Sequence, residues 1–297
     1  MNSPWELQYI SDVKNKNFVV TGANTGLGLK SVTELANAGA NVVLTCRDIS
    51  QGVQLAKEIN NAIQREAVIS VWLDLVDLDS IAQCAAVIIG HFDKLDGLIN
   101  NAGVVNLPKL THSPSGHEMH MATNHFGHFA LTGHLFNLLI STPNSRVVTV
   151  SSGGYRAGVI NFEDLDWKQR TYSRVKAYGD SKLANLLFMR ELQTKFEQAG
   201  ATSLSVAAHP GLTGTERQQN IGIGGKLTKC LASPVSTGVA PQLFAATDST
   251  VSGRDFYGPK YGIWGPPKKL KVKGNVLNQA LAQKLWLYSS ELTKVTY

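Results

Sequence analysis

The stretch TGANTGLG, residues 21–28, comes directly after the apolar run NFVVT at residues 17–21. Glycines in such a place allow a tight turn, and they let the backbone approach a pyrophosphate that lies against the amide groups opening the next helix. The spacing is G-x-x-x-G-x-G, which differs from the commoner G-x-G-x-x-G pattern of dinucleotide-binding turns. Because the glycines stand between a predicted strand and a predicted helix, the stretch indicates a nucleotide-binding α/β fold.

Lys30 and Ser31 follow closely and raise the alternative of a phosphate loop for nucleoside triphosphates. That motif requires a glycine directly before the lysine and four residues between its two glycines. Here Leu29 precedes Lys30, and five residues separate Gly22 from Gly28. The sequence therefore does not match this motif.

Short apolar runs rich in β-branched residues alternate with longer segments of helical spacing. Unbroken apolar strands are typical of a sheet buried on both faces, and the alternation predicts parallel strands joined by right-handed crossovers. We therefore predict an α/β fold, a doubly wound Rossmann-type parallel sheet of about seven strands flanked by helices, in a single domain over residues 1–297. The runs lie at residues 17–21, 41–45, 67–73, 96–100, 146–151 and 204–208, and the helical segments at residues 27–38, 50–63 and 80–89.

Three segments depart from this rhythm. Residues 153–177 are polar and aromatic and are predicted to be an insertion, and residues 212–232, which contain GIGG at 222–225, are predicted to be a substrate loop. Residues 254–297 are predicted to be a C-terminal extension, in which six basic side chains accompany a single acid between residues 254 and 273.

The composition excludes several classes of protein. An apolar content of 43% supports a substantial core and excludes a disordered chain. The net charge of +6 is mild and lacks the broad basic stripe of a nucleic-acid-binding module, whereas the basic segment is compatible with peripheral contact with a membrane surface. No run of about 18 apolar residues is present, so we expect no transmembrane segment.

The cysteines and the first residues bear on location. Cys46, Cys84 and Cys230 are widely spaced and form no C-x-x-C pair, and the first residues lack the basic and apolar regions of a signal peptide. This pattern predicts no disulfide framework and fits a reducing, cytoplasmic location.

The end of the second predicted strand bears on the choice of cofactor. A ribose with free hydroxyls is held there by a carboxylate, whereas a 2′-phosphate is held by a guanidinium. The usual acidic position is Cys46, and Arg47 follows it, so the sequence predicts NADP(H) in preference to NAD(H). Asp48 either pairs with Arg47 or caps the helix that follows, and both interpretations stay open.

Six of the eight histidines fall between His112 and His134, and His117-Glu118 followed by His120 resembles a zinc hydrolase motif at first sight. That motif places its histidines four residues apart, so that both lie on one helix face. Here the separation is three, and we predict no metal site.

Further motifs give the chain its resemblance to a known family, the short-chain dehydrogenase/reductases. They occur in that family's order over about 200 residues, and the resemblance covers residues 13–260. They are TGANTGLG (21–28), Asp74 in LDL, NNAG (100–103), Asn124 in TNHFGHF, VSS (150–152), Tyr178 and Lys182 in YGDSK, and HPG (209–211).

The resemblance implies a catalytic role for Tyr178, which would donate a proton to a carbonyl oxygen or accept one in the reverse direction. Lys182 lies four residues later, one helical turn away, although such a pair on its own is usually an ordinary helix face. An unperturbed phenol has a pKa of about 10. We expect the ammonium of Lys182, together with the charge of the oxidised nicotinamide, to lower the pKa of Tyr178.

Two further catalytic residues are implied by the resemblance. Ser152, the second serine of the pair with Ser151, would hydrogen-bond the substrate oxygen, and Asn124 would hold a water molecule that relays protons to Lys182.

The resemblance also implies a set of cofactor-binding residues, which lie in the glycine turn, at the ends of the later strands and in the catalytic pair. They are Gly22, Asn24, Thr25, Gly26, Leu27, Gly28, Arg47, Asp74, Leu75, Asn101, Ala102, Gly103, Tyr178, Lys182, Pro210, Gly211 and Thr213.

One departure from many family members points to a branch. Ser152 and Tyr178 are 26 residues apart, a spacing that resembles the branch of the retinol dehydrogenases and light-dependent protochlorophyllide reductases. Members of that branch often act on bulky hydrophobic carbonyl compounds. The aromatic residues of the insertion either cover an apolar substrate pocket or pack into a small separate core, and monomer and homo-oligomer both stay open.

The predicted function is therefore that of an NADP(H)-dependent oxidoreductase, which interconverts a hydrophobic ketone or aldehyde and an alcohol by hydride transfer. Two alternatives stay open. One is an NADPH-binding sensor or interaction protein with little turnover, and the other is an enzyme that reduces a conjugated double bond.

Overall fold

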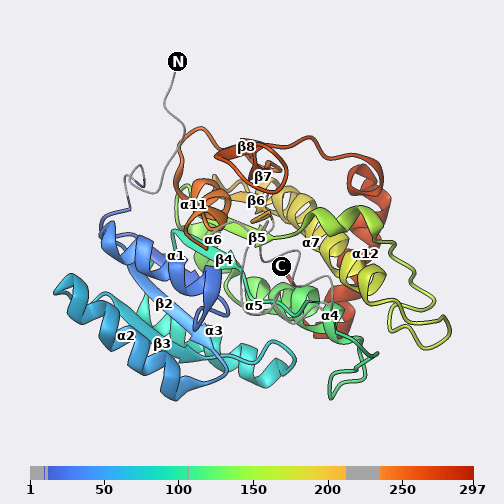
Figure 1. Ribbon diagram of the computed structural model, residues 1–297, viewed down its shortest axis with the longest axis horizontal. Helices are drawn as coiled ribbons and strands as arrows, with labels where there is room; N and C mark the ends of the chain where they lie inside the picture. Colours follow the sequence, from blue (N-terminus) through green and yellow to red (C-terminus); the bar gives the residue numbers. More distant parts are fainter. Residues whose placement is uncertain (1–9, 11–12, 106, 212–234) are drawn as a thin grey trace.

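A computed structural model describes residues 10, 13–105, 107–211 and 235–297. Its centre is one sheet with the strand order β3-β2-β1-β4-β5-β6-β7-β8 (Figure 1). The first seven strands pair in parallel, and only β8 is antiparallel to its neighbour. The strands are β1 Asn17–Val20, β2 Asn41–Cys46, β3 Val68–Trp72, β4 Gly97–Asn100, β5 Arg146–Val150, β6 Leu204–Ala208, β7 Phe256–Pro259 and β8 Pro267–Lys269.

The α/β fold with a doubly wound parallel sheet is confirmed, with eight strands where about seven were predicted. Every predicted strand is present, and no bound differs from its predicted position by more than one residue. β7 and β8 were not predicted. They are short, proline occurs in both, and β8 has the sequence PKK, which carries no strand pattern.

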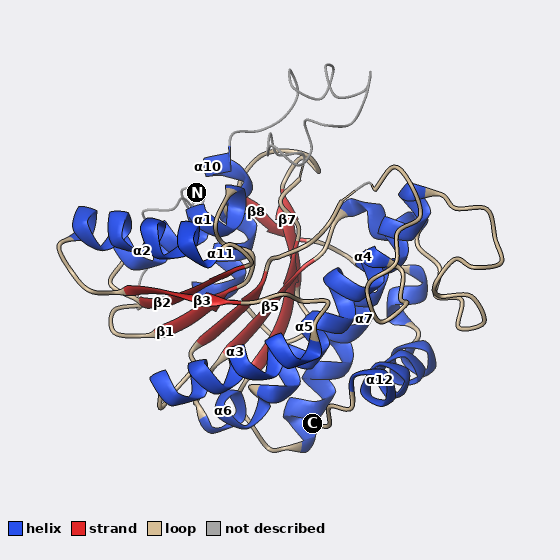
Figure 2. Ribbon diagram, turned by 90° about the horizontal axis from the view of Figure 1, so that it is seen from below, coloured by secondary structure: helices blue, strands red, loops and turns tan. Residues whose placement is uncertain are grey.

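Helices cover both faces of the sheet (Figure 2). One layer contains α1 and α2 with α10 and α11, and the other contains α3, α5, α6 and α7, with α12 packed outside α7. The helices are α1 Gly26–Asn37, α2 Ile49–Ile63, α3 Leu78–His91, α4 Met119–Met121, α5 Gly127–His134, α6 Phe136–Ser141, α7 Arg174–Gln198, α10 Val235–Gly238, α11 Ala240–Thr247 and α12 Gln279–Thr293, with a π-helical turn at Ala122–Phe126 and 3₁₀ turns at Gly153–Ala157 and Gly274–Leu277.

The strands are apolar on both sides because each side is covered. Val19 and Val20 in β1 are both fully buried, yet they belong to different core clusters, since successive side chains of a strand point to opposite faces. A parallel sheet of this kind brings the carboxyl ends of β1, β2, β4, β5 and β6 to one edge. The loops that follow these strands therefore meet there.

The predicted insertion at residues 153–177 contributes to a core of its own. Tyr155, Ile160 and Leu165 are buried in a cluster with side chains of α7 and α12. The positions of these three side chains therefore favour the interpretation that the insertion packs into a small separate core over the one that it covers a substrate pocket. Tyr172 behaves differently, because its hydroxyl donates to the backbone oxygen of Leu107 at 3.0 Å.

The predicted substrate loop at residues 212–232, and with it the predicted cofactor residue Thr213, lies outside the described residues. The predicted C-terminal extension contains β7, β8 and α12. Within the described part of the chain, no helix has the length and apolar character that a membrane span requires.

Candidate active site

A hydrogen-bond network at the carboxyl edge of the sheet holds three loops together. Thr21, the residue that follows β1, accepts the backbone N–H groups of Asn101 and Ala102 through its hydroxyl oxygen, both at 2.9 Å. The same hydroxyl lies 2.8 Å from Nε2 of His128, and Nδ1 of His128 lies 3.0 Å from the backbone oxygen of Asn124. Because Nδ1 must donate to that carbonyl, Nε2 accepts from Thr21.

Burial, with a smaller contribution from the nearby charge of Lys182, lowers the pKa of His128 to about 4. The imidazole is therefore neutral at pH 7, which this network requires. The sequence motifs gave His128 no such role. Only the contact with Thr21, more than a hundred residues away in the chain, identifies it.

The π-helical turn at Ala122–Phe126 presents Asn124 to the site. Its side-chain oxygen accepts the N–H of Val104 at 2.8 Å, and its Nδ2 donates to the Val104 oxygen at 3.1 Å and to Ser181 Oγ at 2.9 Å. The amide thus clamps the segment after β4 to α7. The predicted role of Asn124 as the holder of a water molecule stays a prediction.

The glycine turn has the close packing that a dinucleotide site needs. Gly22 has a φ of +62°, and a Cβ there would lie 2.7 Å from the Cβ of Ala102. A Cβ at Gly28 would lie 2.6 Å from the Gly22 oxygen, so the first turn of α1 rests directly on the turn before it. Thr25 stands at the N-cap of α1, and Gly26 and Leu27 are its first residues. Backbone N–H groups at such a helix start are suited to a pyrophosphate.

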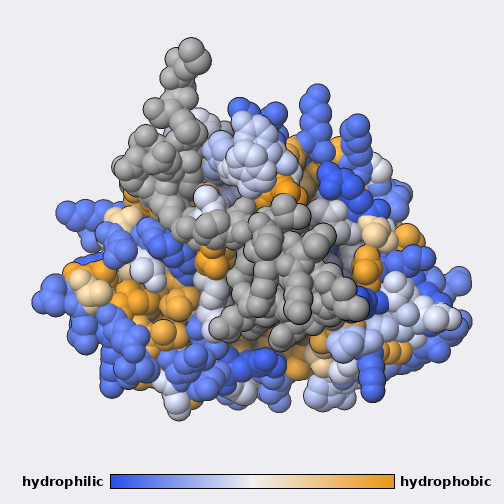
Figure 3. Space-filling view, viewed as in Figure 1, coloured by the Kyte–Doolittle hydropathy of each residue, from blue (hydrophilic) through white to orange (hydrophobic). Residues whose placement is uncertain are grey.

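A cavity of about 450 Å³ adjoins this turn. Seven predicted cofactor residues line it, namely Gly22, Asn24, Arg47, Asp74, Leu75, Ala102 and Gly103. Its other lining residues are Cys46, Leu73, Val76, Val104, Val105, Leu107, Pro108 and Thr123. Apolar surface is exposed in the lower left part of Figure 3, where Figure 1 draws β2, β3 and α3. The residues that line the cavity fit a nicotinamide dinucleotide.

The two interpretations of Asp48 are settled by its contacts. Asp48 is the N-cap of α2, and its carboxylate accepts the N–H of Gln51 at 3.0 Å. Arg47 is exposed and lines the cavity. Cys46 occupies the strand end, so the guanidinium is the charged group that β2 offers to this cavity.

The two serines that follow β5 make different contacts. Ser151 is buried, and its hydroxyl donates to the backbone oxygen of Lys182 at 2.8 Å, which ties β5 to α7. Ser152 lies near Tyr178, since a Cβ at Gly154 would be 3.4 Å from the Tyr178 ring and 3.6 Å from Ser152 Oγ, and Ser152 Oγ accepts the N–H of Gly154 at 3.2 Å. Ser152 is therefore the serine that lies beside the phenol.

Burial raises the pKa of Tyr178, and the neighbouring Ser152 hydroxyl opposes this rise only in part. The direction is opposite to the lowering that we expected from Lys182. Lys182 lies 5.7 Å from the centroid of the Tyr178 ring, and burial lowers its own pKa to about 8. Within the protein alone, a protonated phenol is favoured, which suits a proton donor.

Lys182 is held in place from β5. Its Nζ donates to the Val150 oxygen at 3.0 Å, and Asn185 donates to the same oxygen at 3.1 Å. A Cβ at Gly103 would lie 3.7 Å from Nζ and 2.9 Å from Asn124 Oδ1, so the backbone of Gly103 closely approaches both side chains. Lys182 and Asn124 thus approach the cavity wall at Gly103, whereas Ser152, Tyr178 and Lys182 are not themselves among the residues that line the cavity.

The remaining predicted residues lie around this centre. Asn101 supports the turn, because its Nδ2 donates to the Thr21 oxygen at 2.8 Å. Pro210 and Gly211 follow β6, where Gly211 has a φ of +74° and donates its N–H to His209 Nδ1 at 3.1 Å. The structure therefore brings the predicted catalytic residues to the same sheet edge as the glycine turn.

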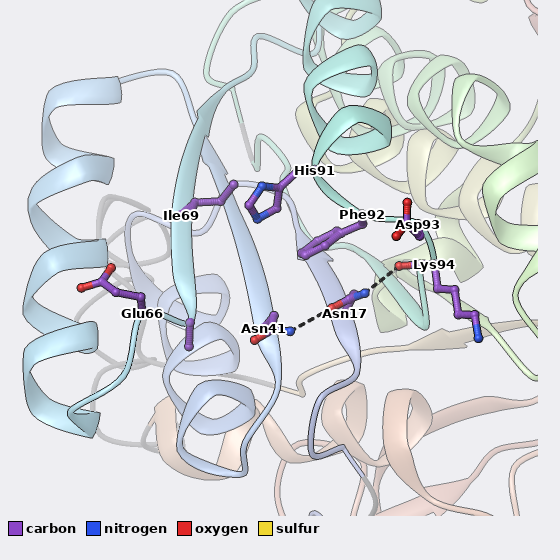
Figure 4. A pocket seen from close by; sticks show the side chains of 9 residues that line it. Asn17, Asn41, Glu66, Ile69, His91, Phe92, Asp93 and Lys94 are labelled. Atoms are coloured by element: carbon purple, nitrogen blue, oxygen red, sulfur yellow. Dashed lines mark hydrogen bonds between the residues drawn. The ribbon is translucent and has the colours of Figure 1, made fainter.

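A second hollow, of about 650 Å³, lies at the opposite edge of the sheet (Figure 4). Its amide side chains bond to neighbours, because Asn41 donates to Asn17, and Asn17 donates to the Lys94 oxygen. None of the predicted site residues lines it. It is therefore no rival to the cavity beside the glycine turn.

The histidine-rich segment shows no metal site. His117 contacts Asp166, whereas His120 is turned toward Glu118. Across the described residues, no group of three or more potential metal-binding His, Cys, Asp or Glu side chains occurs.

Comparisons with known proteins agree with this architecture. The family model described as short chain dehydrogenase matches residues 16–224. Retinol dehydrogenase 13 of Homo sapiens is 36% identical over 293 residues, covering 94% of this chain and 85% of the relative. Retinol dehydrogenase 11 of Homo sapiens is 42% identical over 201 residues, covering 68% of this chain and 62% of the relative.

Solved structures show the same fold. An uncharacterised protein from Mycobacterium Paratuberculosis matches with a TM-score of 0.84 and 34% identity, over 99% of both chains. A short chain dehydrogenase from Shigella flexneri 2a str. 301, solved as a complex with NADP, matches with a TM-score of 0.67 and 23% identity, covering 84% of this chain and 98% of that chain.

Proposed function

This chain belongs to the short-chain dehydrogenase family, and we propose that it is an NADP(H)-dependent enzyme that interconverts a hydrophobic ketone or aldehyde and the corresponding alcohol. Family membership and the likeness to retinol dehydrogenases make it an oxidoreductase that acts on alcohol and carbonyl groups. The cofactor preference, the role of Tyr178 and the substrate class are the parts that we propose.

The observation that carries the proposal is the contact between Ser152 and Tyr178 beside a cavity lined by the glycine turn. Two hydroxyl groups on one side of a bound carbonyl can both donate to its oxygen as negative charge develops there. Tyr178 then transfers its proton, and the ammonium of Lys182 stabilises the phenolate that is left. When bound, the dinucleotide supplies the hydride.

The first experiment follows NADPH oxidation by the purified protein with a panel of carbonyl compounds, including retinal, medium-chain aldehydes and a small polar ketone. We expect turnover with the hydrophobic members and little with the polar one. Tight NADPH binding without turnover of any carbonyl would favour the sensor alternative. Turnover only with conjugated enones, at the carbon–carbon double bond, would favour the other alternative.

Arg47 supports NADP(H) as the preferred cofactor, because it is the guanidinium at the cavity and Asp48 is engaged as a helix cap. Replacing Arg47 with alanine should weaken NADPH binding by about 10- to 100-fold and leave NADH binding nearly unchanged, since only NADPH carries the 2′-phosphate. Titration of each dinucleotide by calorimetry measures both affinities.

The matched control is Lys57→Ala, which removes an exposed positive charge from α2 outside the cavity. It should change neither affinity beyond about twofold, because exposed charges are largely screened by salt. Equal affinities of the wild type for NADPH and NADH would contradict the proposed preference.

We also propose peripheral contact with an anionic membrane surface through the turn between β7 and β8. Tyr261, Ile263 and Trp264 are 55%, 37% and 54% exposed there. Five lysines and no acidic residue occur between residues 260 and 273. Tyrosine and tryptophan suit the membrane interface, and each lysine near an anionic surface contributes about 1 kcal/mol.

Sedimentation with vesicles measures this contact. We expect binding to vesicles that contain phosphatidylserine, weaker binding to phosphatidylcholine alone, and a loss in Trp264→Ala. The control Trp72→Ala removes a tryptophan that is 40% exposed on β3 and should bind like the wild type. Equal binding by wild type and Trp264→Ala would contradict a role for this turn. For the enzyme as a whole we propose a cytoplasmic location, which its free Cys46 and Cys84 thiols fit.

A further inference from the structure

Glu118 and His120 form a buried pair of polar side chains, and the His120 ring packs against Tyr178. Both side chains are fully buried. Glu118 Oε1 lies 2.7 Å from His120 Nδ1, and Glu118 Oε2 accepts the N–H of Met121 at 2.9 Å. Each carboxylate oxygen is therefore engaged by a protein donor.

The other ring nitrogen of His120 faces the cavity wall. Nε2 accepts the backbone N–H of Leu107 at 3.4 Å, and Leu107 lines the cavity. A nitrogen that accepts an N–H carries no proton, so the ring proton lies on Nδ1 and points to Glu118. The two contacts thus select one neutral tautomer of His120 and fix the plane of its ring.

The same ring packs against the proposed proton donor. The ring centroids of His120 and Tyr178 are 5.9 Å apart, and the ring planes meet at 67°, which is an edge-on contact. Leu107 is held from its other side, since its oxygen accepts the Tyr172 hydroxyl at 3.0 Å. His120 therefore connects the Tyr178 ring with the segment that closes the cavity.

A carboxylate buried beside a neutral ring is a costly way to fill a core, because apolar residues of the same volume would pack there with less desolvation. Its hydrogen bonds give orientation instead, and a reacting group must be held within about 0.5 Å of its productive place. An apolar residue could fill the same space but could not bond to the Leu107 N–H.

We propose that Glu118 and His120 form a positioning pair for the reductase reaction. Glu118 orients His120, and His120 holds both the Tyr178 ring and the cavity wall at Leu107 in the reactive arrangement. This inference rests on the proposed function, because it assigns the pair to that same site.

The test compares kcat, KM and NADPH affinity in the wild type and in His120→Phe, which retains an aromatic ring and loses both hydrogen bonds. We expect kcat to fall by up to about 100-fold, because the Tyr178 ring is then held less well in its reactive position. NADPH affinity should change by less than about twofold, because the residues that contact the dinucleotide are unaltered. His120→Gln, which has both a donor and an acceptor, should recover about tenfold of the loss.

Two further variants separate positioning from a general loss of packing. In the double variant of Glu118→Gln and His120→Phe, the decrease in kcat should equal that of His120→Phe alone, since Glu118 acts through His120. The control His117→Phe changes a neighbouring, partly exposed histidine that contacts Asp166, and it should keep the wild-type kcat.

The outcomes distinguish this inference from the function on which it rests. A wild type that turns over no carbonyl overturns both. An active wild type whose kcat is unchanged in His120→Phe overturns the positioning pair alone, as do losses that multiply in the double variant. If His120→Phe fails to fold, Glu118→Gln is tested instead. We expect its kcat to fall by about tenfold. An unchanged kcat in this variant would contradict the inference.

Discussion

Replacing Tyr178 with phenylalanine is expected to reduce carbonyl turnover by about 100- to 10,000-fold, the usual contribution of a positioned general acid. The change removes one oxygen atom from a ring that stays packed against His120, so the fold should be preserved. NADPH affinity should stay within about twofold, because the cavity is lined by the glycine turn and the strand ends. Steady-state kinetics with the best carbonyl of the panel, and dinucleotide titration, measure both effects.

Tyr288→Phe is the matched control for this variant. It removes the hydroxyl of a tyrosine in α12, which packs against Phe126 and Phe162 away from the catalytic pair. Its turnover should equal that of the wild type. Full turnover by Tyr178→Phe would show that another group delivers the proton, and the role assigned to this tyrosine would be wrong.

The second large effect expected is a loss of stability in mild acid. Burial lowers the pKa of His128 and of His209 to about 4, and that of His125 to about 3, from an ordinary value of 6.5. Below pH 6.5 these three histidines therefore become protonated in the unfolded chain, whereas in the folded chain they stay neutral until about pH 4 or below. Stability that depends on these groups is present above pH 6.5 and is lost as the pH falls.

Two carboxyl groups, Asp180 and Glu191, act in the opposite direction because burial raises the pKa of each, while burial lowers the pKa of His134 and so adds to the loss. Burial raises the pKa of Asp180 to about 6, so the folded chain takes up a proton there that the unfolded chain takes up only near pH 4. The net difference is about two protons between pH 6 and pH 4.5, and the free energy of unfolding should fall by about 3 kcal/mol per pH unit. Urea unfolding at several pH values measures this slope.

A matched variant assigns one of these protons. His125 Nε2 lies 2.9 Å from Ser289 Oγ, and both side chains are buried. Replacing both partners, in the double variant His125→Phe and Ser289→Ala, removes the hydrogen bond without leaving a buried polar group unpaired. The slope should then fall by about 1.4 kcal/mol per pH unit. An unchanged slope would mean that His125 does not contribute.

Much of the site was predictable because parallel strands bring their carboxyl ends together. Once residues 17–21, 96–100 and 146–151 are recognised as neighbouring strands, the glycine turn, Gly103 and Ser152 must lie at one edge. That Tyr178 and Lys182 share one helix face follows from the helix period, whereas their catalytic roles are implied by the resemblance to the family. These placements need only local pattern and the handedness of the crossovers.

What could not be predicted depends on contacts between distant segments. The hydrogen bond between Thr21 and His128 joins residues 107 positions apart, and neither residue type predicts this contact. The pKa of Tyr178 was expected to fall because the nearby charge was visible in the sequence, whereas the opposing burial was not. Likewise, Glu118 and His120 were considered only as metal ligands, because their shared enclosure appears first in three dimensions.

The π-helical turn at Ala122–Phe126 has a consequence for the phase of the helix on either side of it. There, Gly127 donates its N–H to the oxygen of Ala122, five residues earlier instead of four. Deleting one residue from this turn would restore the regular period and rotate everything before the deletion by about 100° relative to α5. Shortening by a single codon would thus swing the imidazole of His120 away from the phenol, while the helix itself would become more regular.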